Sequence, residues 1–164
     1  MSTNLLLVSP YNVNFYGGVQ NQVNLFKNNL DSSKFNVRIL APDSFDYDIG
    51  KSFRIPFNGS NNPISLLPNK QILNEAIAWA DIIHIHEPFI PLFFWRLKSS
   101  KKIIVTHHAK ISKFIYFGLK FLYLTLRNKN FYSTAVSDEA KANALTLSKK
   151  TRIIPNFIVI NENI

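Results

Sequence analysis

Cysteine is absent from this sequence of 164 residues. Its absence excludes a disulfide framework, a metal site built from thiolates and a cysteine nucleophile. A membrane-spanning helix needs about 20 apolar residues, whereas the most apolar candidate segment, residues 115–126, is shorter and contains Lys120. The first residues also lack the basic and apolar regions of a signal peptide. We therefore expect a cytoplasmic protein, at most peripheral on the inner face of the membrane.

Acidic residues are scarce, with 10 Asp and Glu against 19 Lys and Arg, and the formal net charge is +9. The first 82 residues carry equal numbers of both signs, so the whole excess lies in the second half. Basic and aromatic residues interleave there, a composition that suits nucleic acids or anionic membranes. No RRM, KH, helix-turn-helix or zinc-finger pattern is present, so we expect no nucleic acid. An anionic membrane surface is preferred, with a solvated basic face as the alternative. The residues proposed for this surface are Lys110, Lys113, Lys120 and Arg127.

Short apolar runs alternate along the chain with segments of helical spacing. The runs predict strands at residues 4–9, 35–40, 53–55, 82–86, 102–106, 132–136 and 152–154. The periodic segments predict helices at residues 18–30, 69–80, 92–98, 112–127 and 138–147, the last with Ser137 as its N-cap. Such alternation is typical of an α/β fold, a Rossmann-like doubly wound parallel sheet. Ligands of such folds bind at the carboxyl ends of the strands.

A glycine pair lies between the first strand and its helix, in the segment PYNVNFYGGVQ at residues 10–20. At the start of a helix, Gly17 and Gly18 would let backbone N–H groups approach an anion such as phosphate. The alternative is a tight turn without a ligand, because the GxGxxG and P-loop patterns are absent.

Histidines follow two of the predicted strands. In IHIHEP, His84 and His86 point to one face of a strand, and with His108 or Glu87 they could bind a metal. We prefer a polar strand end at which His86 and Glu87 line a cleft without metal. In THH, His108 ends the next strand and could hydrogen-bond a substrate hydroxyl or shield developing charge.

A three-residue D-x-D pattern, Asp46-Tyr47-Asp48, matches metal-dependent sugar-nucleotide enzymes. So short a pattern occurs often by chance in a polar loop, and we assign it no metal.

Taken together, these segments resemble the N-terminal domain of GT-B glycosyltransferases of family 4, most closely the phosphatidylinositol α-mannosyltransferases. The segments that carry the resemblance run in the family's order and are PYNVNFYGGVQNQV, FNGS, HIHEP, THH, AVSD and IPN. HIHEP and GGVQ are specific only in combination.

The resemblance implies retaining transfer of a hexose from a sugar nucleotide, GDP-mannose or similar, to a lipid-linked or polyol acceptor. It implies no bound cofactor and no metal. Gly17 and Gly18 would bind the donor diphosphate and His108 would lie beside the transferred sugar. The acceptor-binding positions would be Tyr11, Asn14 and Gln20.

The resemblance also implies a division of the enzyme. Residues 1–155 match the acceptor-side domain, residues 156–164 match a truncated linker, and the donor-binding C-terminal domain of the family is absent from the sequence. We therefore expect a separately encoded C-terminal domain to complete the enzyme. The alternative is a non-catalytic module that binds a membrane or a head group, or a truncated remnant.

Overall fold

Seven parallel strands form the sheet of this protein, in the order β3-β2-β1-β6-β7-β8-β9. The computed structural model describes residues 2–54, 56, 61, 63–65, 69–87, 100–110, 131–144 and 150–158. The strands of the sheet are β1 (Thr3–Val8), β2 (Phe35–Ala41), β3 (Tyr47–Asp48), β6 (Ile82–His86), β7 (Lys102–His107), β8 (Phe131–Ala135) and β9 (Arg152–Ile153). With helices alternating between the strands, this confirms the predicted Rossmann-like α/β sheet.

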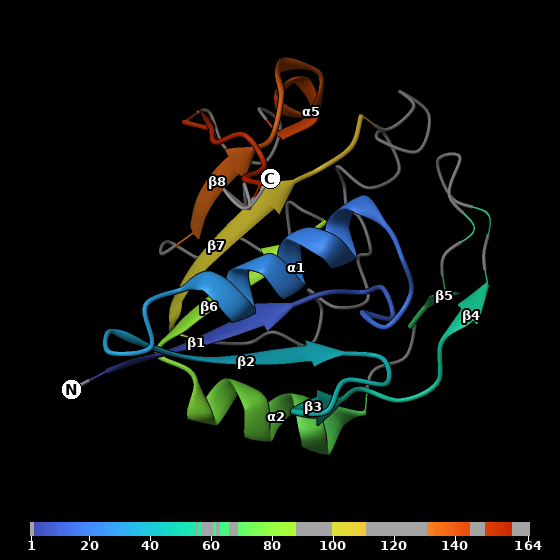
Figure 1. The fold of residues 1–164 in the computed structure, drawn as a ribbon, viewed down its shortest axis with the longest axis vertical. Helices are drawn as coiled ribbons and strands as arrows, with labels where there is room; N and C mark the ends of the chain where they lie inside the picture. Colours follow the sequence, from blue (N-terminus) through green and yellow to red (C-terminus); the bar gives the residue numbers. More distant parts are fainter. Residues whose placement is uncertain are drawn as a thin grey trace, which may run out of the picture.

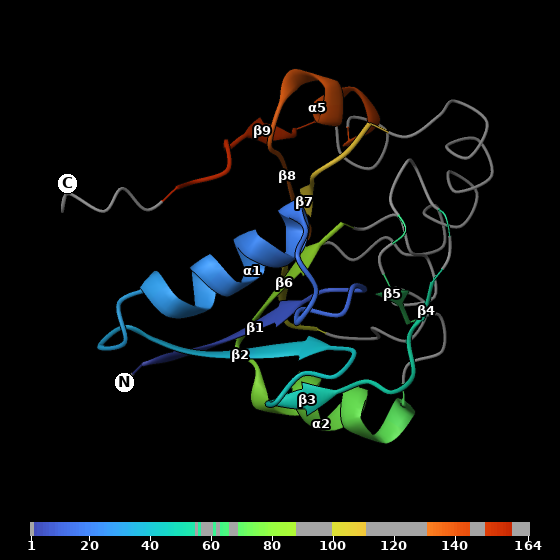
Figure 2. The same cartoon turned by 45° about the vertical axis from the view of Figure 1, so that its right-hand side comes forward.

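Two helices cover opposite faces of the sheet, α1 (Gly18–Asn29) on one and α2 (Lys70–Trp79) on the other (Figures 1 and 2). The alternation of β1 separates its apolar side chains between these two faces. Leu5 and Leu7 pack with Val23 of α1, whereas Leu6 and Val8 pack in the cluster that contains Leu73 of α2. Each fully buried aliphatic side chain stabilises the fold by roughly 2 kcal/mol.

Each described helix begins near the predicted residue. At α2, the side chain of Asn69 accepts hydrogen bonds from the backbone N–H groups of Gln71 and Ile72 at 2.9 and 3.4 Å. The short helix α5 (Asp138–Ala144) begins after Ser137, whose Oγ accepts from the N–H of Ala140 at 3.2 Å. These contacts satisfy backbone donors that have no partner within the helix. The N-cap residue of α1 is Gly17, which offers no side-chain hydrogen bond.

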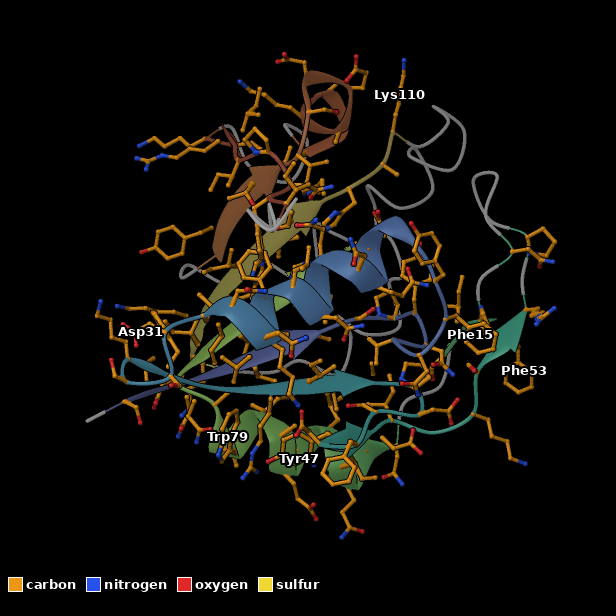
Figure 3. All side chains as sticks on the ribbon, in the orientation of Figure 1. Phe15, Asp31, Tyr47, Phe53, Trp79 and Lys110 are labelled. Atoms are coloured by element: carbon orange, nitrogen blue, oxygen red, sulfur yellow. The ribbon has the colours of Figure 1, made fainter. Side chains whose placement is uncertain are left out.

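The loop after β2 contains structure that the sequence patterns did not predict. Strand β3 extends the sheet beside β2, and its Tyr47 lies under Arg38, whose guanidinium carbon is 5.6 Å from the ring centroid. Figure 3 places Tyr47 near Trp79 of α2, on the same side of the sheet. The predicted strand at 53–55 is present as β4 (Phe53–Arg54), which pairs antiparallel with β5 (Pro63–Ile64).

Two predicted helices, at 92–98 and 112–127, lie outside the described residues. Among the helices that the structure does describe, none is both long enough and apolar enough to span a bilayer.

Candidate functional site

All four histidines of the chain lie at or near the carboxyl ends of β6 and β7. His84 and His86 belong to β6, His107 ends β7 and His108 follows it. The N-terminal end of α1 lies beside the carboxyl end of β7 in both views (Figures 1 and 2). The fold therefore brings the histidines to the same edge as the glycine pair, as expected for a parallel sheet.

A buried chain of hydrogen bonds joins β6, β7 and β8. His84 Nε2 lies 2.7 Å from Thr106 Oγ1, which lies 2.7 Å from Thr134 Oγ1. Thr134 donates its proton to the carbonyl of Val105 at 3.2 Å, so Thr106 must donate to Thr134, and His84 must donate to Thr106. His84 is thus a neutral Nε2–H tautomer, in agreement with burial lowering its pKa to about 3.

His86 and His108 form a second hydrogen bond, with His86 Nδ1 and His108 Nε2 3.0 Å apart. Burial lowers the pKa of His108 to about 4 and that of His86 well below its ordinary value, so both rings are neutral at pH 7. Two neutral rings share one proton across this bond. The outer nitrogens, His86 Nε2 and His108 Nδ1, are buried without a partner among the described residues. His108 Nδ1 can therefore offer a donor or an acceptor, with His86 in the complementary tautomer.

The histidine pair lines a cavity of about 380 Å³. Thr106 and Thr134 line it beside the rings, and Phe26 of α1 contacts His84 and His86 edge-on, with ring centroids 5.4 and 5.6 Å apart. The rest of the lining is mainly apolar, contributed by Leu5, Leu30, Phe35, Ile82, Ile104, Val136, Ile154 and Pro155. A few polar groups in an apolar hollow are typical of a small-molecule site.

The segment after β9 closes one side of this cavity against α1. Gln22 donates its side-chain N–H to the carbonyl of Phe157 at 2.9 Å, and the rings of Phe26 and Phe157 meet edge-on at 5.1 Å. The start of the predicted linker, Asn156 and Phe157, is thus part of the domain surface that borders the site.

The first glycine of the pair borders a second hollow, of about 230 Å³, lined by Val13, Asn14, Phe15, Tyr16, Gly17, Asn21 and Asn24. The first intrahelical bond of α1 runs from the N–H of Asn21 to the carbonyl of Gly17, at 2.8 Å. The N–H groups of Gly18, Val19 and Gln20 therefore have no partner within the helix. A Cβ atom at Gly18 would meet nothing within 4 Å. The space in front of this helix end is open, as an anion site requires.

A profile described as Glycosyltransferase Family 4 matches residues 16–162. The chain belongs to glycosyltransferase family 4. It is similar to the phosphatidyl-myo-inositol mannosyltransferase of Mycobacterium leprae, 29% identical over 121 residues, which covers 65% of this chain and 32% of the relative. The corresponding protein of Mycolicibacterium smegmatis is 33% identical over 119 residues, covering 65% and 31%. The chain thus spans about a third of the length of the curated relatives it matches.

The three residues predicted to bind the acceptor in this family 4 domain occupy different environments. Tyr11 is 7% exposed and packs in the core cluster, where burial and then the charge of Glu87 raise its pKa. Gln20 is 2% exposed, and its Nε2 has no partner among the described residues. Asn14 is exposed and donates to the carbonyl of Asp43 at 2.9 Å.

Of the predicted membrane-surface residues, only Lys110 lies within the described residues. It is exposed and projects away from the sheet (Figure 3), and its charge lowers the pKa of Glu139 after the larger effects of hydrogen bonds at that group. Lys113, Lys120 and Arg127 lie outside the described residues.

The two aspartates of the D-x-D pattern serve the local structure. Asp46 binds the Lys27 ammonium and accepts the N–H of Ile39 at 2.9 Å. Asp48 accepts the N–H groups of Asp43 and Gly50, each at 2.9 Å.

Three residues that line the site, Phe26, Thr106 and Thr134, were not predicted as site residues. A signal was available for the threonines, because Thr106 precedes the THH histidines and Thr134 stands opposite Thr106 in the strand register. For Phe26 the sequence offers only helical spacing, which indicates a buried face and not a site.

Proposed function

We propose that this chain is the acceptor-side half of a family 4 hexosyltransferase. In this proposal it moves a hexose, mannose in the first instance, with retention of configuration, from a sugar nucleotide such as GDP-mannose to a lipid-linked or polyol acceptor. The observation that carries the proposal is the buried Nδ1 of His108, which has no partner in the described part of the chain and belongs to a ring that lines the cavity. A neutral imidazole there can hydrogen-bond a hydroxyl of the transferred sugar.

The donor diphosphate is assigned to the N-terminal end of α1. Three backbone N–H groups without helical partners and the helix dipole favour a phosphate oxygen at this point. Gly17 and Gly18 leave the space that such a group would occupy. Charge on the leaving diphosphate would be stabilised by dipoles that are already oriented before the reaction, which costs little reorganisation.

We propose that the transfer is independent of metal. Support comes from the D-x-D pattern, whose carboxylates already accept hydrogen bonds from backbone donors and, for Asp46, an ammonium group. Recruiting them as metal ligands would require breaking these bonds. In this proposal the protein catalyses transfer by positioning the reactants and stabilising charge.

The acceptor is proposed to be a lipid at an anionic membrane surface on the cytoplasmic side. The names of the mycobacterial relatives, phosphatidyl-myo-inositol mannosyltransferases, support a lipid acceptor. A donor-binding domain is proposed to complete the active site, because the chain covers only about a third of these relatives.

The test is a transfer assay with labelled sugar nucleotides and phosphatidylinositol-containing vesicles, with extraction of lipid-linked product. The chain is assayed alone and together with a family 4 donor-binding domain, and that domain alone is the control. We expect product only when both parts are present. Vesicle binding without product under every combination would instead establish a non-catalytic membrane or head-group binding module.

A further inference from the structure

Glu87 has an unusual backbone conformation directly after β6. Its φ angle is 59°, in the left-handed region that residues with a Cβ rarely adopt. Glycine would adopt this turn without steric cost. A glutamate at such a position indicates that its side chain has a role that glycine could not fill.

Backbone and side chain of Glu87 both reach the neighbouring strand. Its N–H donates to the carbonyl of Thr106 at 3.0 Å. Its carboxyl group accepts a hydrogen bond from the backbone N–H of His108. The two bonds therefore hold the chain on both sides of His107, at the end of β7.

The carboxyl group of Glu87 is buried. Glu87 is 2% exposed, and its Oε1 atom has no hydrogen-bond partner among the described residues. Burial, opposed by the His108 hydrogen bond, raises its pKa to about 8. Among the described residues, the titratable groups that interact with it are Tyr11 from the segment after β1 and His108 from the residue after β7. Glu87 is thus a neutral acid at pH 7, which a glutamine can imitate in shape and in acceptor capacity.

We propose that Glu87 is a positioning residue that fixes the imidazole of His108 by holding its backbone at the end of β7. Among the described residues, the His108 ring makes one hydrogen bond, the 3.0 Å bond to His86. The direction in which Nδ1 points toward a ligand therefore depends on the position of the His108 backbone. The expected effect of Glu87 on catalysis rests on the proposed function. The position of the His108 ring can be measured whether or not the protein transfers a sugar.

The experiment compares Glu87→Gln with Glu87→Gly on the whole chain. The glutamine keeps an acceptor for the His108 N–H, whereas the glycine keeps the left-handed turn and removes the acceptor. We record the ring nitrogen signals of His108 by NMR, assigned with His108→Asn, between pH 3.5 and 9.5. We expect E87Q to retain the wild-type signals at pH 6.5. In E87G, we expect the His108 signals to shift and the pKa of His108 to rise by at least about one unit toward its ordinary value of 6.5.

Unchanged His108 signals and an unchanged His108 pKa in E87G would overturn the proposal. If E87G does not fold, E87Q decides alone. The wild-type His108 backbone N–H signal should shift as Glu87 titrates near pH 8, and this step should be missing in E87Q. A step that persists in E87Q, or that is absent from the wild type, would overturn the proposal.

A second readout concerns transfer by the chain completed with a donor-binding domain. We expect E87G to lower kcat by about 10- to 100-fold, with KM for the sugar nucleotide within about twofold of wild type, because misplacement of a group by about 1 Å has effects of this size. E87Q should restore kcat. Equal kcat values for all three proteins would overturn the positioning role. If none of the proteins transfers a sugar, that result counts against the proposed function, and the NMR measurements alone then test the role of Glu87.

Discussion

His86 Nδ1 lies 3.0 Å from His108 Nε2, and the two rings stack with an interplanar angle of 25°. One partner comes from β6 and the other from the residue after β7, so the bond joins two strand ends in the lining of the cavity. Because burial keeps both rings neutral, the pair holds one shared proton. A ligand that hydrogen-bonds to His108 Nδ1 thereby selects the tautomer of both rings.

The buried histidines predict a loss of stability on acidification. The pKa of His108 is about 4 in the folded protein against 6.5 ordinarily, so the unfolded chain takes up a proton between these values and the folded protein does not. Stability is therefore complete above about pH 6.5 and falls as the pH drops toward 4, by about 3 kcal/mol for His108 alone. Urea denaturation across this range measures the loss. A flat profile between pH 7 and 4.5 would contradict neutral burial of the histidines.

Glu87 predicts an effect of the opposite sign, a loss of stability as the pH rises from 4.5 to 8. Its pKa is raised to about 8 from 4.5, so the folded protein retains a proton that the unfolded chain has lost. This contribution is present below pH 4.5 and is lost as the pH rises through 8. In the same urea series, E87Q should be less sensitive than wild type between pH 6.5 and 8.5. Parallel profiles for the two proteins would count against a protonated Glu87.

Replacement of Gly18 by valine should abolish binding of the donor diphosphate without unfolding the domain. A Cβ at Gly18 meets nothing within 4 Å of the protein, but branched methyl groups would occupy the space in front of the helix N–H groups. The free energy of unfolding should stay within about 1 kcal/mol of wild type. Calorimetric titration of the completed enzyme with GDP-mannose measures the binding, and Gly18→Ala is the matched smaller change. If Gly18→Val binds GDP-mannose with wild-type affinity, the diphosphate does not bind at this helix end.

Thr106→Val should destabilise the protein although the two side chains have the same shape. The change leaves His84 Nε2–H without its acceptor and Thr134 Oγ1 without its donor in a buried network. A loss of about 1–3 kcal/mol in the free energy of unfolding is expected. Ser33→Ala removes an exposed hydroxyl that bonds to Asp31 and serves as the control, with an expected change within about 0.5 kcal/mol. Equal effects of the two substitutions would show that the threonine chain contributes nothing.

Salt should weaken the proposed binding to anionic vesicles, because exposed charges are screened over a Debye length of about 8 Å at physiological ionic strength. Replacing Lys110, Lys113, Lys120 and Arg127 together by glutamine should remove most of the salt dependence in a co-sedimentation assay. Neutral vesicles provide the control. Binding that does not respond to salt would point instead to an apolar contact.

Periodicity was sufficient to predict most of the described fold. Apolar runs such as Leu5–Leu6–Leu7 and the spacing of Val19, Val23 and Phe26 report burial directly, and each was found in the core or packed against it. The edge strand Tyr47–Asp48 was not predictable in this way, since two residues carry no period. It depends on contacts with other segments, since Arg38 donates to Tyr47, and Asp46, directly before the strand, binds Lys27.

The candidate site was predictable only in part. Strand ends in a parallel sheet converge, so the grouping of His86, Glu87 and His108 followed from the topology. The pairing of His86 with His108 and the left-handed turn at Glu87 could not be predicted, because both depend on the register between β6 and β7. The roles predicted for Tyr11, Asn14 and Gln20 stay predictions.

The most direct test of the account is hexose transfer by the chain completed with a family 4 donor-binding domain, comparing wild type with His108→Ala. We predict that the wild type transfers mannose from GDP-mannose to phosphatidylinositol. The variant should fold and bind the donor but transfer at least about 100-fold more slowly, because it lacks the imidazole that we propose to lie beside the transferred sugar. Transfer by His108→Ala at the wild-type rate would contradict the central claim.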